Sequence, residues 1–339
     1  MEEPGYVSTG RLPPEQDVAA LVDDAHRRYR DVEIGSVSDV YPALARVSPA
    51  LYGICVASVD GRVHAVGDAE VAFTIMSVAK PFTFALVCDV LGPDEIQRRV
   101  GVNATGLPFN SLEALEVDTG GRTNPMVNPG AIATASFAPG DSATEKWRFV
   151  RDGLSRFAGR RLSMNQDVYA SEAGSNMRNH GIAHLLNSYG RLYFDPDAAT
   201  DVYTRQCSLE VTVHDLAAMG ATLANGGVNP ETGDRVIAAS VCRRVLAVMA
   251  TAGLYELSGD WLYEIGVPGK SGVSGGIVTV APGKGGLATF SPPLDPAGNS
   301  VRGQLVTKYL AERIGLNLFA SEARPSPTTP FPRDGSAGE

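Results

Sequence analysis

The stretch "FTIMSVAKPFTF", from Phe73 to Phe84, places one serine, Ser77, and one lysine, Lys80, a helical turn apart inside a largely apolar segment. Side chains at positions i and i+3 of a helix face the same side, so these two can meet without help from the rest of the fold. One interpretation is structural: a helix that begins at a serine cap and carries a lysine whose stem reaches water. The other interpretation is catalytic: a nucleophile beside its base.

The catalytic interpretation requires Lys80 to lose its proton near neutral pH. Burial lowers the pKa of a lysine, and the apolar neighbours of the pair supply that burial. A nearby positive charge has the same effect, and Lys270 lies in "PGKSGVSGG", a glycine-rich stretch that feeds a predicted strand. If this strand borders the site, we expect Lys270 to help to keep Lys80 neutral. Backbone N–H groups at the helix start and on the glycine-rich strand would bind a developing oxyanion.

The composition is that of an ordinary globular protein: 339 residues, of which 44% are hydrophobic. The net charge of -9 argues against nucleic acid and against an anionic membrane surface as partners. No apolar run approaches the about 18 residues of a membrane span. The N-terminal sequence is acidic and rich in proline and glycine, unlike a signal peptide, so we expect a cytoplasmic protein.

The four cysteines are scattered and form no CxxC motif, which predicts reduced thiols that mostly fill the core. Cys207 differs in having polar neighbours, which are compatible with an exposed thiol. His180 and His184 have the i, i+4 spacing of zinc ligands, but Gly181 stands where a zinc hydrolase carries its glutamate, and no Cys/His cluster supplies further ligands. We therefore predict no metal site. Asp215, next to a histidine at a predicted helix start, is interpreted as favouring the helix dipole.

Both ends of the chain are rich in proline, serine and glycine, which predicts disordered tails at residues 1–14 and 321–339. Between them, residues 15–320 contain no linker and no repeat, so we expect one domain.

Within this domain, β-type runs predict sheet segments at about 50–72 and 255–320, and helical periodicity predicts a lobe at about 77–253. The first sheet segment is a hairpin hinged on Asp60-Gly61. The two sheet segments can pair only if the helical middle is set to one side. The expected fold class is α+β, with an antiparallel sheet flanked by helices, a helical lobe, and a cleft between them in which a site would lie.

Several blocks in order show that the chain resembles the serine-dependent glutaminases, which have a β-lactamase/transpeptidase-like fold. The resemblance runs from about Tyr41 to Gly276 and rests on "VYPALA", "MSVAK", "GLPFNS", "NPMVNPGAI", "SEAGSNMRN", "YTRQCSLEVTVHDLAAMGATLANGGVNP" and "PGKSGVSGGI". It implies hydrolysis of L-glutamine to L-glutamate and ammonia, without a cofactor or a metal. It also implies a homo-oligomer, either a dimer or a tetramer.

By this resemblance Ser77 is the nucleophile, Lys80 its base, and Tyr255 the residue that helps to relay the proton to the leaving ammonia. The oxyanion hole would be formed by the backbone N–H groups of Ser77 and Val273. The family's substrate contacts carry over onto Tyr41, Asn128, Glu172, Asn179, Tyr203, Lys270 and Ser271, in addition to Ser77, Tyr255 and Val273. Such a set suits an amino-acid zwitterion, because a carboxylate can pair with the α-ammonium group while hydroxyls and amides hold the other end.

One departure from the family lies beside the nucleophile, where Met76 replaces the usual glutamine. Two alternative functions stay open at this point. The first is a penicillin-recognising serine hydrolase, since S-x-x-K followed by K-[ST]-G is also the signature of those enzymes. The second is a catalytically weak protein that binds glutamine on the same scaffold, as the loss of the glutamine side chain at Met76 would permit.

Overall fold

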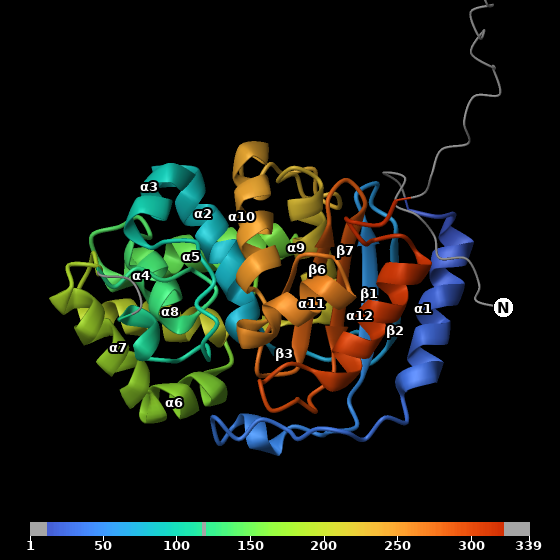
Figure 1. Ribbon diagram of the computed structural model, residues 1–339, viewed down its shortest axis with the longest axis horizontal. Coiled ribbons are helices and arrows are strands. Elements are labelled where there is room, and N and C mark those ends of the chain that lie inside the picture. The colour runs from blue at the N-terminus through green and yellow to red at the C-terminus, as the bar shows by residue number, and fades with distance from the viewer. Residues whose placement is uncertain (1–11, 117–119, 322–339) are drawn as a thin grey trace, which may run out of the picture.

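A computed structural model of the protein describes residues 12–116 and 120–321. The disordered tails expected at 1–14 and 321–339 lie outside these residues, except for 12–14 and 321. Two regions make up the molecule: a sheet with helices on both faces, and a helical lobe on the left of Figure 1. Among the described residues, no helix is long and apolar enough to cross a membrane.

The sheet is antiparallel, with five strands in the order β2-β1-β7-β6-β5. Its strands are β1 (Gly53–Ser58), β2 (Val63–Gly67), β5 (Gly269–Ser271), β6 (Gly276–Ala281) and β7 (Gly285–Phe290). The predicted hairpin is confirmed: β1 and β2 pair around Asp60-Gly61, where Gly61 has a φ of 86°. The two predicted sheet segments also meet as expected, since Cys55 of β1 lies opposite Ala288 of β7.

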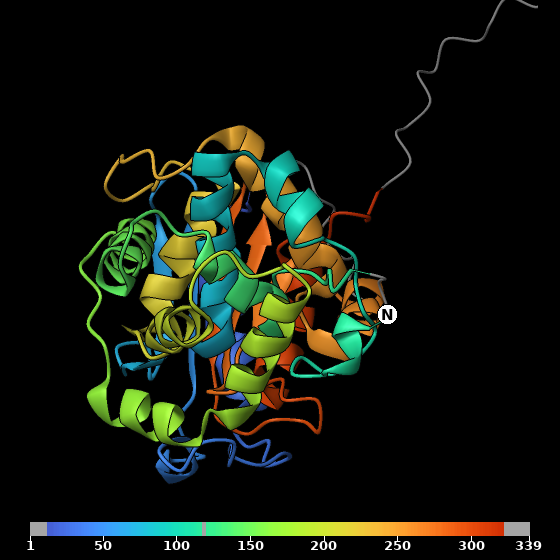
Figure 2. The ribbon, with the colours of Figure 1, turned by 90° about the vertical axis from the view of Figure 1, so that its left-hand side faces the viewer.

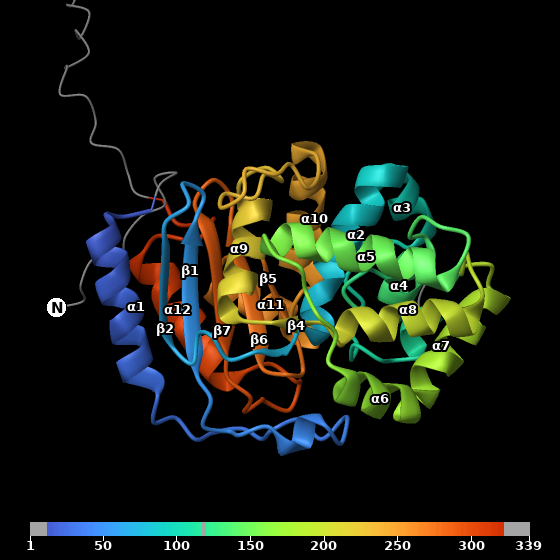
Figure 3. The same ribbon diagram turned by 180° about the vertical axis from the view of Figure 1, so that it is seen from behind.

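Alternation along β1 explains how the sheet is buried on both faces. Ile54 and Val56 join the hydrophobic cluster beneath α1 (Glu15–Tyr29) and α12 (Val301–Arg313), whereas Cys55 joins the larger cluster on the opposite face. Successive side chains of a strand point to opposite faces, so one strand serves two cores. Figure 3 shows α1 and α12 on one side of the strands and α9 (Val213–Ala224) on the other.

The helix α9 approaches the sheet closely because two glycines face each other. A Cβ atom added at Gly286 would lie 2.4 Å from the carbonyl oxygen of Ala217, and one added at Gly220 would lie 3.1 Å from the Cα of Gly286. Larger residues at these positions would push the helix away from the sheet.

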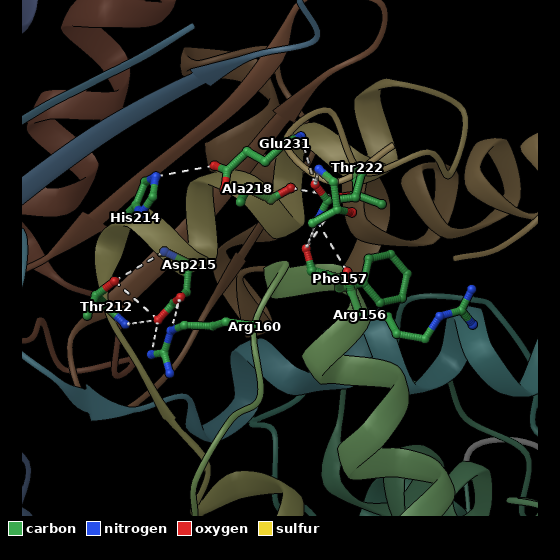
Figure 4. A network of polar contacts seen from close by, with 11 residues as sticks. Arg156, Phe157, Arg160, Thr212, His214, Asp215, Ala218, Thr222 and Glu231 are labelled. Carbon is green, nitrogen blue, oxygen red and sulfur yellow. Dashed lines mark hydrogen bonds and ion pairs between the residues drawn. The ribbon is translucent and has the colours of Figure 1, made fainter. Parts of the chain in front are cut away.

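The polar contacts in Figure 4 fix the N-terminus of α9 to α5 (Ala143–Ala158) and the segment after it. Asp215 closes a capping box with Thr212 and accepts two hydrogen bonds from the Arg160 guanidinium, at 2.6 and 2.5 Å. His214 instead faces Glu231, at 3.2 Å. The interpretation of Asp215 as a residue of the helix start is confirmed. Its carboxylate caps α9 and binds Arg160, so its role is structural.

The helical lobe is seen end-on in Figure 2, with the strands behind it. It contains α2 (Ala79–Leu91), α3 (Pro93–Arg99), α4 (Asn128–Ser136), α5, α6 (Gln166–Ser175), α7 (Met177–Ser188) and α8 (Pro196–Cys207). Three further helices, α10 (Ala239–Ala252), α11 (Ser258–Glu264) and α9, return the chain to the sheet. The short 3₁₀ helices are η1 (Leu44–Arg46), η2 (Met76–Val78), η3 (Glu113–Leu115) and η4 (Tyr255–Leu257).

A two-stranded sheet marks the junction of the two regions. Its strands β3 (Phe73–Thr74) and β4 (Glu210–Val211) pair antiparallel, immediately before η2 and immediately after α8. This pairing brings the segment "FTIMSVAK" to the junction between the sheet and the helical lobe.

Candidate active site

Ser77 lies in η2, between β3 and α2, where the backbone turns sharply. Met76, just before it, has a φ of 47°, in the left-handed region that side chains other than glycine rarely adopt. Of the described residues other than glycine, only Met76 and Tyr255 have a positive φ. Backbone conformations of this kind cost free energy and concentrate at functional sites. Met76 directly precedes Ser77 in the sequence, and the Tyr255 side chain lies near that of Ser77.

The glycine-rich turn between β5 and β6 packs directly on η2. A Cβ atom added at Gly272 would lie 3.1 Å from the carbonyl oxygen of Ile75 and 3.1 Å from a methyl group of Val78. This close approach places Val273 beside Ser77, from a segment almost 200 residues away in the sequence. Among the described residues, no acceptor takes a hydrogen bond from the backbone N–H of Ser77 or of Val273, so both are available to a ligand.

Lys80 occupies the first turn of α2 and is buried. Its ammonium group donates to the side-chain oxygen of Asn128 at 2.7 Å and to the carbonyl of Met126 at 3.3 Å. Burial lowers the pKa of Lys80 to about 7, so the neutral form of the lysine is accessible at neutral pH. No hydrogen bond between described residues joins Lys80 to Ser77 in this structure; catalytic hydrogen bonds often form only when the substrate binds.

Lys270, on β5, is also buried and lies near Lys80. Its amine donates to the carbonyl of Ser271 at 2.6 Å and lies over the ring of Tyr255, 4.2 Å from the ring centre. The pKa of Lys270 falls well below its usual value, first through burial and then through the charge on Lys80. Burial is the main cause of the lowered pKa of Lys80, and the expectation that the charge on Lys270 adds to this effect stays a prediction.

Tyr255 begins η4 and reaches back to the nucleophile. Its hydroxyl donates to the carbonyl of Ser271 at 3.1 Å, and the nearby Ser77 side chain acts to lower the pKa of the phenol. Burial raises the pKa of Tyr255 to about 12, so the phenol keeps its proton at neutral pH. The ring packs against Phe109, with 4.9 Å between the ring centres.

Glu172, on α6, is a buried carboxyl group with one oxygen left over. Its Oε1 accepts a hydrogen bond from the Tyr41 hydroxyl at 3.3 Å, while its Oε2 has no partner among the described residues. Burial raises the pKa of Glu172 to about 8. A buried oxygen without a partner is costly to the fold, and it can be satisfied by a ligand that brings a hydrogen-bond donor.

Asn128 links three elements of the lobe through its side-chain amide. Its oxygen accepts from both Lys80 and Tyr203, the latter at 3.0 Å, and its nitrogen donates to Asn179 at 2.9 Å. Asn179 in turn donates to Asn176 at 2.6 Å. The helix α4 carries no side-chain cap at this end, so Asn128 serves the buried network and not the helix terminus.

The structure therefore brings the candidate residues together into one buried polar cluster at the junction. The helical lobe contributes Lys80, Asn128, Glu172, Asn179 and Tyr203, the loop before η1 contributes Tyr41, and the sheet side contributes Tyr255, Lys270, Ser271 and Val273. Ser77 lies between the two groups. His180 and His184 lie apart from the cluster, on the outer side of α7, where both face Asp197, at 2.7 and 3.4 Å.

Sequence reasoning missed three residues of the cluster. Cys207 is buried at the end of α8, contrary to what its polar neighbours suggested, and burial raises the pKa of its thiol. Asn176 lies in a block that the resemblance already used, "SEAGSNMRN", which was the signal available for it. Asn299, whose side chain accepts from the Ser271 hydroxyl, lies outside every block, and no local pattern marks it.

Comparisons with known proteins agree on one family. The family model described as glutaminase matches residues 35–319. Glutaminase 2 of Yersinia pestis is 57% identical over 317 residues, which cover 94% of this chain and 93% of that protein. The solved structure of the probable glutaminase ybaS is 42% identical with a TM-score of 0.89, covering 91% of this chain and 100% of that one. The structure of Mglu in its glutamate form is 39% identical with a TM-score of 0.84, covering 92% and 71%.

Proposed function

The chain belongs to the glutaminase family, and we propose that its Ser77–Lys80 pair hydrolyses the side-chain amide of L-glutamine to L-glutamate and ammonia. The antiparallel sheet with a helical lobe is the β-lactamase-like fold that the sequence led us to expect. The observation that carries the mechanism is the buried Lys80, one turn from Ser77, whose pKa of about 7 lets it exist as a neutral base.

The first half of the reaction forms an ester. Neutral Lys80 takes the hydroxyl proton of Ser77 as the serine oxygen attacks the amide carbon of the substrate side chain. The resulting oxyanion is bound by the free backbone N–H groups of Ser77 and Val273. As the carbon–nitrogen bond breaks, Tyr255 donates its phenol proton to the nitrogen, which leaves as ammonia, and recovers a proton from the Lys80 ammonium.

The second half releases glutamate. A water molecule attacks the γ-glutamyl ester, and Lys80, neutral once more, takes its proton. The ester bond breaks, the proton returns to the Ser77 oxygen, and L-glutamate is free to leave. Each proton that is taken up in one half is thus returned in the same half.

The specificity for an amino acid follows from Glu172. Its partnerless Oε2 is buried in the cluster and would pair with the α-ammonium group of the substrate. Tyr41 holds the other oxygen of the same carboxyl group. The amides of Asn128 and Asn179, joined to each other, would hold the substrate in place from the lobe side. The glutamate form of the solved Mglu structure supports a site of this kind.

The ester is the step to test. The protein is mixed with L-glutamine and quenched in acid within milliseconds. It is then digested, and the mass of the peptide containing Ser77 is measured by mass spectrometry. We expect a fraction of this peptide to carry one γ-glutamyl group, sensitive to mild base. Turnover without any acylated peptide, under conditions in which hydrolysis of the ester has been slowed by cold, would instead indicate direct attack of water on the amide.

The homo-oligomer, the cytoplasmic location, and the absence of nucleic-acid and membrane partners stay predictions of the sequence and of the resemblance. The mass of the protein in solution, by light scattering, would decide between a dimer and a tetramer.

A further inference from the structure

The turn Asp295–Asn299, which precedes α12, is tightly closed by its own hydrogen bonds. The Asp295 carboxylate accepts from the backbone N–H groups of Ala297 and Asn299, both at 2.9 Å, and the backbone N–H of Asp295 donates to the carbonyl of Asn299 at 2.8 Å. The second carboxylate oxygen accepts from Gln304 of α12 at 2.9 Å. These hydrogen bonds make the turn rigid, so it can fix the position of the residues that pack against it.

This turn touches the active site from the side opposite the helical lobe. Gly298, with a φ of 94°, faces two of its residues: a Cβ atom there would lie 3.5 Å from a methyl group of Val273 and 3.8 Å from the ring of Tyr255. The next residue, Asn299, is completely buried, and its side-chain oxygen accepts a hydrogen bond from the Ser271 hydroxyl. Within residues 12–116 and 120–321 the nitrogen of the same amide has no partner, so the Ser271 bond is the one that fixes the side chain.

Ser271 connects the turn to the proton donor. Its carbonyl accepts hydrogen bonds from both the Tyr255 hydroxyl and the Lys270 amine. Its hydroxyl donates to the Asn299 side chain, so the turn binds Ser271 through its side chain while the phenol donates to the carbonyl of the same residue.

We propose that Asn299 is a positioning residue for Tyr255. By accepting a hydrogen bond from the Ser271 hydroxyl it fixes Ser271, whose carbonyl keeps the phenol in place to donate its proton to the departing nitrogen. This inference rests on the proposed function, in which Tyr255 gives that proton. Without Asn299, the Ser271 hydroxyl loses its acceptor, Ser271 can shift, and the alignment of the phenol with Ser77 is lost.

The test compares two substrates that differ in their leaving group. The amide nitrogen of L-glutamine must be protonated to leave, whereas the sulfur of L-glutamate γ-methyl thioester leaves as a thiolate and needs no proton donor. For Asn299→Ala we expect kcat on L-glutamine to fall about tenfold with KM changed by less than about twofold. On the thioester we expect kcat to stay within about twofold of the wild type, and Tyr255→Phe should show the same discrimination more strongly.

A double-mutant cycle keeps the inference falsifiable if Asn299→Ala folds poorly. Ser271→Ala removes the other half of the same hydrogen bond, so it should show the same discrimination, and the double variant should be no worse than either single variant. Asn229→Ala is the matched control: Asn229 is equally buried and fully hydrogen-bonded, but far from the site in the segment after α9. Its loss should lower the melting temperature without changing the ratio of the two kcat values.

Equal losses on both substrates, no loss on L-glutamine, or additive effects in the double variant would each overturn the inference. Failure of the proposed function is distinguishable from this, because the wild-type protein would then release no ammonia from L-glutamine at all.

Discussion

Replacing Lys80 by methionine should abolish activity and at the same time stabilise the protein at neutral pH. Burial lowers the pKa of Lys80 from an ordinary 10.5 to about 7. Each pKa unit corresponds to ~1.4 kcal/mol, so the buried lysine costs the folded state roughly 4 kcal/mol at pH 7. Methionine has a similar volume and no charge, but it loses the hydrogen bonds to Asn128 and Met126, worth ~1 kcal/mol each. The net expectation is a gain of roughly 2 kcal/mol.

The dependence on pH identifies the cause. Between pH 7 and pH 9 the unfolded chain keeps the proton on Lys80 while the folded protein loses it, so the folded wild type becomes more stable as the pH rises through this range. The advantage of Lys80→Met should therefore shrink by ~2 kcal/mol from pH 7 to pH 9.

The measurement is urea unfolding of both proteins at equal concentration across this range. The control is Lys308→Met, since Lys308 is exposed, has a pKa raised by its ion pair with Glu264, and stays protonated in both states. A stability difference for Lys80→Met that does not change with pH would refute the view that burial keeps this lysine neutral.

Two further predictions concern the pH dependence of activity and of binding. Because Lys80 must be neutral to act and bound substrate already keeps Glu172 ionised, kcat should rise through one ionisation near pH 7, and a kcat profile that is flat from pH 6 to pH 8 would contradict this. Glu172, whose pKa is about 8, is mostly protonated at pH 7, and pairing with the α-ammonium group restores its carboxylate. Binding of L-glutamine to Ser77→Ala should then release close to one proton, measured by calorimetry in buffers of different ionisation enthalpy, and a heat independent of the buffer would count against this role. In Glu172→Gln the release should vanish and the affinity should fall about a hundredfold.

The features that the sequence predicted correctly depend on neighbouring residues. The hairpin at Asp60-Gly61 follows from two residues suited to a tight turn, and the expected helix at the Ser77 segment is present as α2, which carries Lys80. Two β-rich segments with a helical middle were enough to predict the sheet and the lobe. The order of the strands, with β7 between β1 and β6, was beyond these patterns, because it depends on how the segments pack.

Long-range packing also decides the contacts that the sequence left unpredicted. Lys80 donates to Asn128, 48 residues away, and not to the serine one turn from it. Polar neighbours in the sequence made Cys207 look exposed, yet its helix ends inside the cluster. The burial that lowers the pKa of Lys80 likewise depends on packing by distant parts of the chain. Resemblance to a family supplied the candidate substrate residues, which no spacing rule connects, such as Tyr41 and Glu172, 131 residues apart.

The most direct test of the account is ammonia release from L-glutamine by the purified protein, with Ser77→Ala as the blank and a benzylpenicillin acylation assay alongside. The account predicts ammonia release by the wild type, none by the variant, and no stable penicillin adduct on Ser77. If neither protein released ammonia while both still bound glutamine, the protein would be a binding scaffold in which Met76 has replaced the family's glutamine at the cost of catalysis. Undiminished release by Ser77→Ala would contradict the central claim that this serine is the nucleophile.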